Sequence, residues 1–290
     1  MTLETLLPIA LNLSLFLVVF AIGLRASVRD ATYLFRSPGE LVRALLAMSV
    51  LMPLFVALLV FIFDLNPAVK MALVALSVAP VPTLLPMKMV KTQASVGYAI
   101  GVLIMGSVLA IVFVPLAMET IERVYGVPLQ MSVMSIATFV FMVVLLPLGL
   151  GIAVHRYAPA LSQRLAEPIA RIAGVGVLVF LGTLMVLAAP AMWTFVGHGA
   201  VLAIIGFVLV GLVVGHLLGG PTPANRTALS FSTASRHPGL AILIVQANFP
   251  AEKLAMAAAL LFLLVNIVAT MVYPLWTRRR QPLAEELERK

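Results

Sequence analysis

The sequence has no cysteine among its 290 residues, and only 10% of the residues are charged. The lack of cysteine excludes disulfide bonds, thiolate metal sites and cysteine nucleophiles. Soluble globular domains are about a quarter charged, so this scarcity argues against a soluble, disordered or nucleic-acid-binding chain. Hydrophobic residues instead make up 62% of the sequence, and the mean hydropathy is +1.14. The composition predicts a protein that spans a membrane several times.

Long apolar stretches define the predicted architecture. A membrane-spanning helix needs about 20 mostly apolar residues, whereas the strands of membrane barrels are short and alternate in polarity. The predicted fold class is therefore an all-α polytopic membrane protein with about nine transmembrane helices. The predicted spans are 5–25, 39–63, 67–91, 95–117, 128–154, 168–189, 199–218, 223–248 and 254–276.

The basic residues predict an orientation for these spans. Arginines gather in the connections 25–43 and 155–171, and the segment 277–290 is a charged tail. Lysine and arginine are enriched in cytoplasmic loops of membrane proteins. This bias predicts an N-terminus outside, a cytoplasmic C-terminus and a single membrane domain, in an inner membrane of bacterial type.

Acidic and basic residues differ in where they occur along the predicted spans. All eleven acidic residues fall in loops, the tail or span ends, whereas Arg236 and His237 fall midway along 223–248. An arginine at the bilayer centre costs roughly 2.5–3.5 kcal/mol on insertion scales. Arg236 therefore either caps the carbonyl groups of an interrupted helix or contacts an anionic ligand. For His237, a packing role and a ligand or proton role both remain open.

Two spans carry prolines at matching places. Pro86 follows Thr83 by three residues in 67–91, and Pro238 follows Ser235 by three residues in 223–248. A proline inside a helix removes a backbone donor and clashes with the preceding turn. Paired interruptions in two halves of opposite direction are typical of inverted-repeat carriers, with the site at the breaks.

Three segments read NRTALSFSTASRHPGLAILIVQANFP, IGLRASVRDATYLFRSPGELVRALLAMSVLMPL and APVPT. They resemble the bile acid:sodium symporter family, within the bile–arsenite–riboflavin transporter superfamily. The resemblance implies two crossed, broken helices and a division into two parts. These parts are a core of about 39–117 and 199–276 and a panel of about 5–25 and 128–189.

The resemblance also implies positions for the sodium ligands, and this sequence departs from the family there. Sodium, as a hard cation, needs several oxygen ligands, whereas most of these positions carry apolar side chains and one carries an arginine. We therefore predict no metal site and no sodium coupling. The corresponding positions are Met48, Leu85, Pro86, Ala99, Leu103, Ser232 and Arg236.

The predicted function is secondary transport of a small organic anion, either bile-acid-like or a smaller carboxylate, by alternating access without a cofactor. The alternatives are sodium-dependent symport through backbone ligands, and a channel or sensor on the same scaffold. Catalysis is disfavoured because the sequence has no G-x-S-x-G or H-E-x-x-H motif. The predicted partners are the organic anion and the lipid bilayer, and protons acting through His237 remain an option. The sequence does not indicate an oligomeric state. The candidate substrate-binding residues are Thr83, Pro86, Lys88, Ser232, Ser235, Arg236, His237, Pro238 and Asn266.

Overall fold

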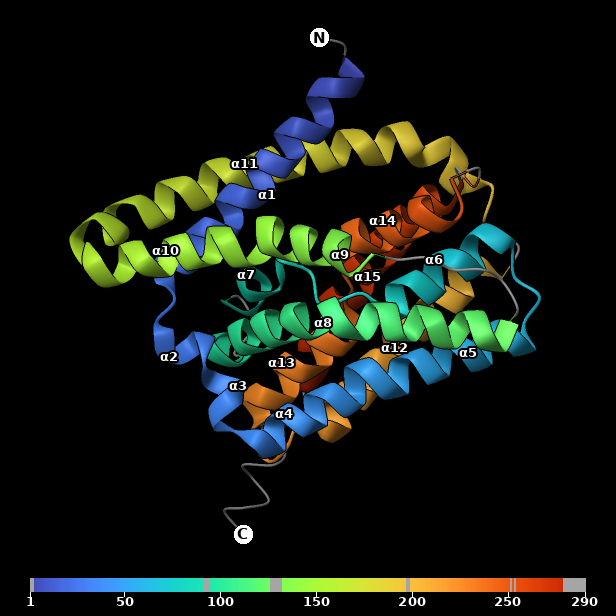
Figure 1. The fold of residues 1–290 in the computed structure, drawn as a ribbon, viewed down its shortest axis with the longest axis horizontal. Helices are drawn as coiled ribbons and strands as arrows, with labels where there is room; N and C mark the ends of the chain where they lie inside the picture. The colour runs from blue at the N-terminus through green and yellow to red at the C-terminus, as the bar shows by residue number, and fades with distance from the viewer. Residues whose placement is uncertain are drawn as a thin grey trace.

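The computed structural model describes residues 3–90, 94–125, 132–196, 199–250, 252 and 254–278. Within these residues every regular element is helical (Figure 1). The π-helical turns η1 and η2 join α4 to α5 and α9 to α10 without a break. The elements are α1 (Leu3–Arg25), α2 (Val28–Ala31), α3 (Tyr33–Arg36), α4 (Pro38–Leu45), η1 (Leu46–Leu51), α5 (Met52–Ile62), α6 (Pro67–Val78), α7 (Leu85–Val90), α8 (Val96–Tyr125), α9 (Val133–Val140), η2 (Phe141–Leu145), α10 (Leu146–Tyr157), α11 (Pro159–Trp193), α12 (Ala200–Leu218), α13 (Pro223–Ala234), α14 (Pro238–Asn248) and α15 (Leu254–Arg278).

Helices α1, α9, α10 and α11 form one layer, which we call the peripheral layer and which lies along the upper side of Figure 1. Helix α1 packs against both α10 and α11. A Cβ atom placed on Gly23 would lie 2.9 Å from the Cα atom of Gly151. Small residues let helix backbones approach closely in membranes. These two glycines therefore set the close α1–α10 contact.

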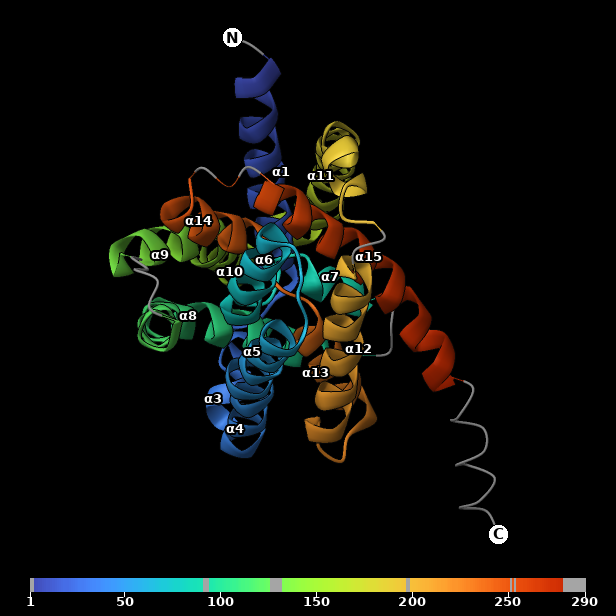
Figure 2. The same cartoon turned by 90° about the vertical axis from the view of Figure 1, so that its right-hand side faces the viewer.

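The remaining helices form what we call the central group, shown from the side in Figure 2. Helices α6 and α13 lie deep inside it, because most of their residues are buried. The buried hydroxyls of Ser232 and Thr233 donate to the carbonyls of Ala228 and Leu229, each at 2.8 Å. Bonding to the preceding turn satisfies these polar groups in an apolar setting.

Helix α12 holds α13 through a face of glycines spaced four residues apart. Gly211, Gly215 and Gly219 each lie against the α13 backbone. A Cβ atom on Gly211 would lie 2.6 Å from the Cα atom of Ala234, the last residue of α13. This face fixes the end of α13, where the second interruption begins.

Replacing Gly211 by alanine is expected to destabilise the protein. Overpacking of this kind costs typically about 1–3 kcal/mol, because the added methyl group meets backbone atoms. Thermal unfolding of the purified protein measures the effect. Gly206→Ala on the same helix is the matched control, since nothing lies within 4 Å of its Cβ position. Equal melting temperatures for the two variants would contradict the close approach.

The basic connections are themselves largely helical. The segment 25–43 holds α2, α3 and the start of α4, and α11 begins two residues after α10 ends. Helix α11 therefore starts nine residues before the predicted span 168–189. Each carboxylate oxygen of Glu167 accepts a hydrogen bond, one from Arg25 and the other from Arg171. These bonds stabilise the polar first part of α11.

Six helical segments of the described chain are long and apolar enough to cross a membrane. Three predicted spans fall elsewhere, on α1 and on the interrupted pairs α6–α7 and α13–α14. The six segments are Pro38–Ile62, Val96–Arg123, Val133–Tyr157, Pro159–Trp193, Ala200–Leu218 and Leu254–Met271.

Candidate functional site: the crossing of two interrupted helices

Two chain interruptions form the centre of the molecule. Helix α6 ends at Val78 and α7 begins at Leu85, with Pro80 and Pro82 between them. Helix α13 ends at Ala234 and α14 begins at Pro238. The missing N–H of a proline does no harm in the first turn of a helix. The prolines therefore determine where each helix stops and restarts.

The two interruptions touch each other through their backbones. The backbone N–H of His237 donates to the carbonyl oxygen of Pro80 at 2.8 Å. Unpaired backbone groups are costly at membrane depth, and this bond pairs one such group from each break. The predicted crossing residues of the two segments are thus brought together.

Asn266 on α15 completes the second interruption. Its Nδ2 donates to the carbonyl oxygen of Ala234 at 2.9 Å, and its Oδ1 accepts from the Ser235 hydroxyl at 3.1 Å. The side chain is only 1% exposed. Asn266 therefore supplies the donor that the terminal carbonyl of α13 would otherwise lack.

Arg236 is the largest fully buried polar side chain of the crossing and is 2% exposed. Its Nη2 donates to the carbonyl of Met48 at 2.9 Å, and its Nη1 lies 3.4 Å from the carbonyl of Ala79. The Nε atom is buried without a partner. These are the contacts of a carbonyl-capping arginine, the first of the two roles predicted from the sequence. They join η1, the end of α6 and the second interruption.

His237 caps α14. Its Nδ1 accepts from the backbone N–H of Leu240 at 3.4 Å, and its ring meets the edge of Phe139 with centroids 5.3 Å apart. A nitrogen that accepts a hydrogen bond carries no proton. The observed arrangement therefore uses the neutral ring, and protonation of Nδ1 would remove the cap.

The other candidate residues are less engaged with one another. Thr83 is buried in the turn between the two halves of the first interruption. Ser232 is fully buried, and its hydroxyl bonds within α13. Pro86 is the second residue of α7 and lines a small cavity with Arg25. Lys88 belongs to α7, but its side chain lies outside the described residues.

Four of the positions that the resemblance aligns with sodium ligands present hydrocarbon side chains. Met48 is 5% exposed, while Leu85, Ala99 and Leu103 are fully buried in the main apolar core. What Met48 offers to the crossing is its backbone carbonyl, which accepts from Arg236.

Apolar cavities lie beside the crossing. One of about 390 Å³ lies among α5, α6 and α8, with Ser49, Ser77 and Thr120 as its polar lining. A pocket of about 20 Å³ shares Ser49 with it and reaches Arg236. A volume of this size admits one water molecule. A second apolar cavity, of about 240 Å³, lies among α6, α8 and α14.

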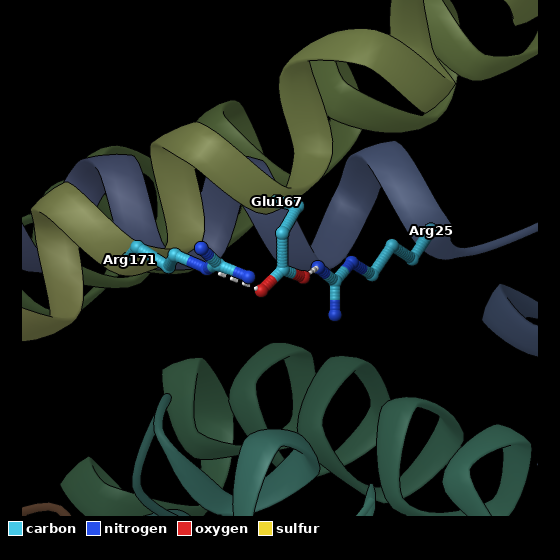
Figure 3. A network of polar contacts seen from close by, with 3 residues as sticks. All are labelled: Arg25, Glu167 and Arg171. Carbon is cyan, nitrogen blue, oxygen red and sulfur yellow. Dashed lines mark hydrogen bonds and ion pairs between the residues drawn. The ribbon is translucent and has the colours of Figure 1, made fainter.

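A group of three charged residues was not predicted as part of any site. Glu167 on α11 lies between Arg25 of α1 and Arg171 of α11, as Figure 3 shows. In the sequence these arginines indicate only the orientation of the spans. The signal that was available is the i, i+4 spacing of Glu167 and Arg171 at the start of an apolar stretch.

The geometry defines an all-helical, multi-pass membrane protein with two interrupted helices joined at their breaks. A family model for the sodium bile acid symporter family matches residues 12–195, and these include the first interruption. The chain belongs to the sodium bile acid symporter family. The predicted membership is therefore confirmed. The family is one of transporters rather than enzymes. No curated protein matches the chain.

Proposed function

We propose that the protein is a secondary transporter of an organic anion that works by alternating access without sodium coupling. The nine predicted spans form an inverted repeat in which the interrupted pairs α6–α7 and α13–α14 both cross the membrane. The central group acts as the core and the peripheral layer as the panel. The N-terminus is outside and the C-terminus is cytoplasmic, following the distribution of basic residues.

The main observation against sodium coupling is the position of the Arg236 guanidinium. It donates to the carbonyl of Met48, a position that by the resemblance corresponds to a sodium ligand, and it lies against the carbonyl of Ala79. Sodium would have to compete for these oxygens with a resident cation, and like charges repel at short range. The hydrocarbon of Leu85, Ala99 and Leu103 offers no replacement ligand.

The same residue supports an anionic substrate. Among the described residues, no ion pair joins Arg236 to a carboxylate. The crossing therefore holds an unneutralised positive charge, to which the N-terminus of α14 adds its dipole. Such a centre favours an anion over a cation. A direct contact requires the crossing to open, since the guanidinium is almost completely covered.

Coupling to protons through His237 is a second option that the contacts make costly. Each protonation of Nδ1 would release the α14 cap that accepts from Leu240. A transporter that cycles protons there would have to break and remake this cap in every turnover. We therefore place facilitated or exchange transport ahead of proton coupling.

Thermal stabilisation of the purified protein tests the proposal. We expect cholate, benzoate or both to raise the melting temperature equally in sodium, potassium and choline buffers. Uptake of the same anion into proteoliposomes should saturate and show exchange across the membrane. A requirement for sodium would mean that backbone carbonyls form a sodium site, and single-channel conductance would favour a channel. Binding without flux would indicate a sensor.

A further inference from the structure

The cavity between the peripheral layer and the central group has an arginine in its lining. It has a volume of about 60 Å³ and is lined by Arg25 of α1, Pro86 and Met87 of α7, and Ala170 of α11, with apolar residues of α1 and α8. The cavity lies between the peripheral layer and the central group, the two parts that we propose to move against each other. Substrate would therefore enter or leave through this cavity.

The guanidinium of Arg25 already holds a carboxylate. Its Nη2 donates to Glu167, whose second oxygen accepts from Arg171 Nε at 2.8 Å. The three side chains lie in a row in Figure 3, with Glu167 in the middle. Two arginines against one carboxylate leave one positive charge in excess. The site therefore recognises a carboxylate and is not neutralised by the one it contains.

The internal carboxylate is held weakly enough to be displaced. The side chain of Arg25 is 46% exposed and that of Glu167 is 54% exposed. Exposed ion pairs contribute little to stability, because water and salt compete with them. An incoming anion can therefore exchange with Glu167 at little cost. The volume of the cavity suits a carboxylate head but not a large hydrocarbon body.

We infer that Arg25 is a docking residue for the carboxylate of the transported solute and that Glu167 is its built-in competitor. This inference rests on the proposed function and adds a substrate contact outside the helix crossing. Solute arriving from the side of the α1 C-terminus takes the place of Glu167 on Arg25, beside Pro86. Glu167 then remains paired with Arg171, its neighbour on α11.

Binding of cholate to the full-length protein in phosphatidylcholine nanodiscs tests the inference. Glu167→Gln should bind cholate about threefold more tightly, because an exposed competing ion pair is lost. Arg25→Gln should bind it about tenfold more weakly, because a charge-assisted bond is lost. In the double variant the gain from Glu167→Gln should disappear. Glu119→Gln is the matched control, because Glu119 forms an exposed pair with Arg123 on α8.

Unchanged or weaker cholate binding by Glu167→Gln, with normal binding by the wild type, would overturn the inference and leave the proposed function intact. Failure of the wild type to bind cholate, benzoate or any other organic anion would overturn both. Anionic lipids could use the same arginines, so the measurement is repeated with phosphatidylglycerol added. An effect of Glu167→Gln on lipid binding alone would assign the site to a headgroup and contradict the solute role.

Discussion

Replacing Arg236 by methionine is expected to reduce anion transport by about a hundredfold while changing the melting temperature little. Removal of a buried charge without a carboxylate partner relieves a desolvation penalty of several kcal/mol. The loss leaves the carbonyls of Met48 and Ala79 without a donor, at about 1–3 kcal/mol each. These effects on stability oppose each other. The effect on transport is one-sided, because the positive charge of the crossing disappears. A hundredfold loss corresponds to about 2.7 kcal/mol.

Transport rates in proteoliposomes and melting temperatures, measured on the same preparation, separate these effects. Arg236→Lys keeps the charge but not the fork of donors, so about a tenth of the rate should remain. Arg226→Met is the matched control on α13, the helix that precedes the interruption, because Arg226 also bonds a backbone carbonyl, that of Gly220, at 2.6 Å. It should lower stability and leave transport within about threefold. Wild-type transport by Arg236→Met would show that the guanidinium is not needed for anion movement.

Arg236→Gln is a distinct variant, because it replaces the guanidinium by a neutral amide at a position that, by the resemblance, corresponds to a sodium ligand of the family. We expect its transport to remain independent of sodium. One amide oxygen does not make a site for a hard cation that needs several, and Leu85, Ala99 and Leu103 still contribute hydrocarbon. Uptake in sodium and in choline measures this. A gain of sodium dependence would mean that the resident guanidinium was the only obstacle.

The sequence predicted the crossing because proline acts locally. Pro238 begins α14, and the residues before it leave the helix. The pairing of Arg236 with Met48 could not be predicted, because the two lie 188 positions apart and the acceptor is a backbone carbonyl. Any residue type offers that carbonyl, so no side-chain pattern marks it. The π-helical turn η1, which contains Met48, carries no clear sequence signal either.

The polar first part of α11 escaped prediction for a different reason. Its charges resembled those of a loop when counted along the chain, whereas Glu167 and Arg171 are neighbours on a helix surface. Arg25 joins them from 142 positions away. The relevant information is a three-dimensional contact between α1 and α11, and hydropathy alone does not contain it.

Replacing Asn266 by leucine is expected to lower both stability and transport, in contrast to Arg236→Met. The two side chains are similar in volume, so no large cavity forms. The carbonyl of Ala234 and the hydroxyl of Ser235 lose their partner in a buried site, and each such loss costs about 1–3 kcal/mol. No desolvated charge is removed to offset this. The melting temperature should therefore fall by about 5 °C or more, and transport by at least about tenfold.

Thr270→Val on the same helix is the control for this variant. Thr270 is also buried, but its hydroxyl donates within α15, to Asn266 O at 2.6 Å and Ile267 O at 3.2 Å. Both carbonyls lie within α15, so its loss should cost little. Ser235→Ala removes one of the two partners, and in that background Asn266→Leu should cost less than it does alone. Additive losses would contradict the hydrogen-bonded unit of Ala234, Ser235 and Asn266. A stable, inactive Asn266→Leu variant would place Asn266 on the substrate rather than on the interrupted helix.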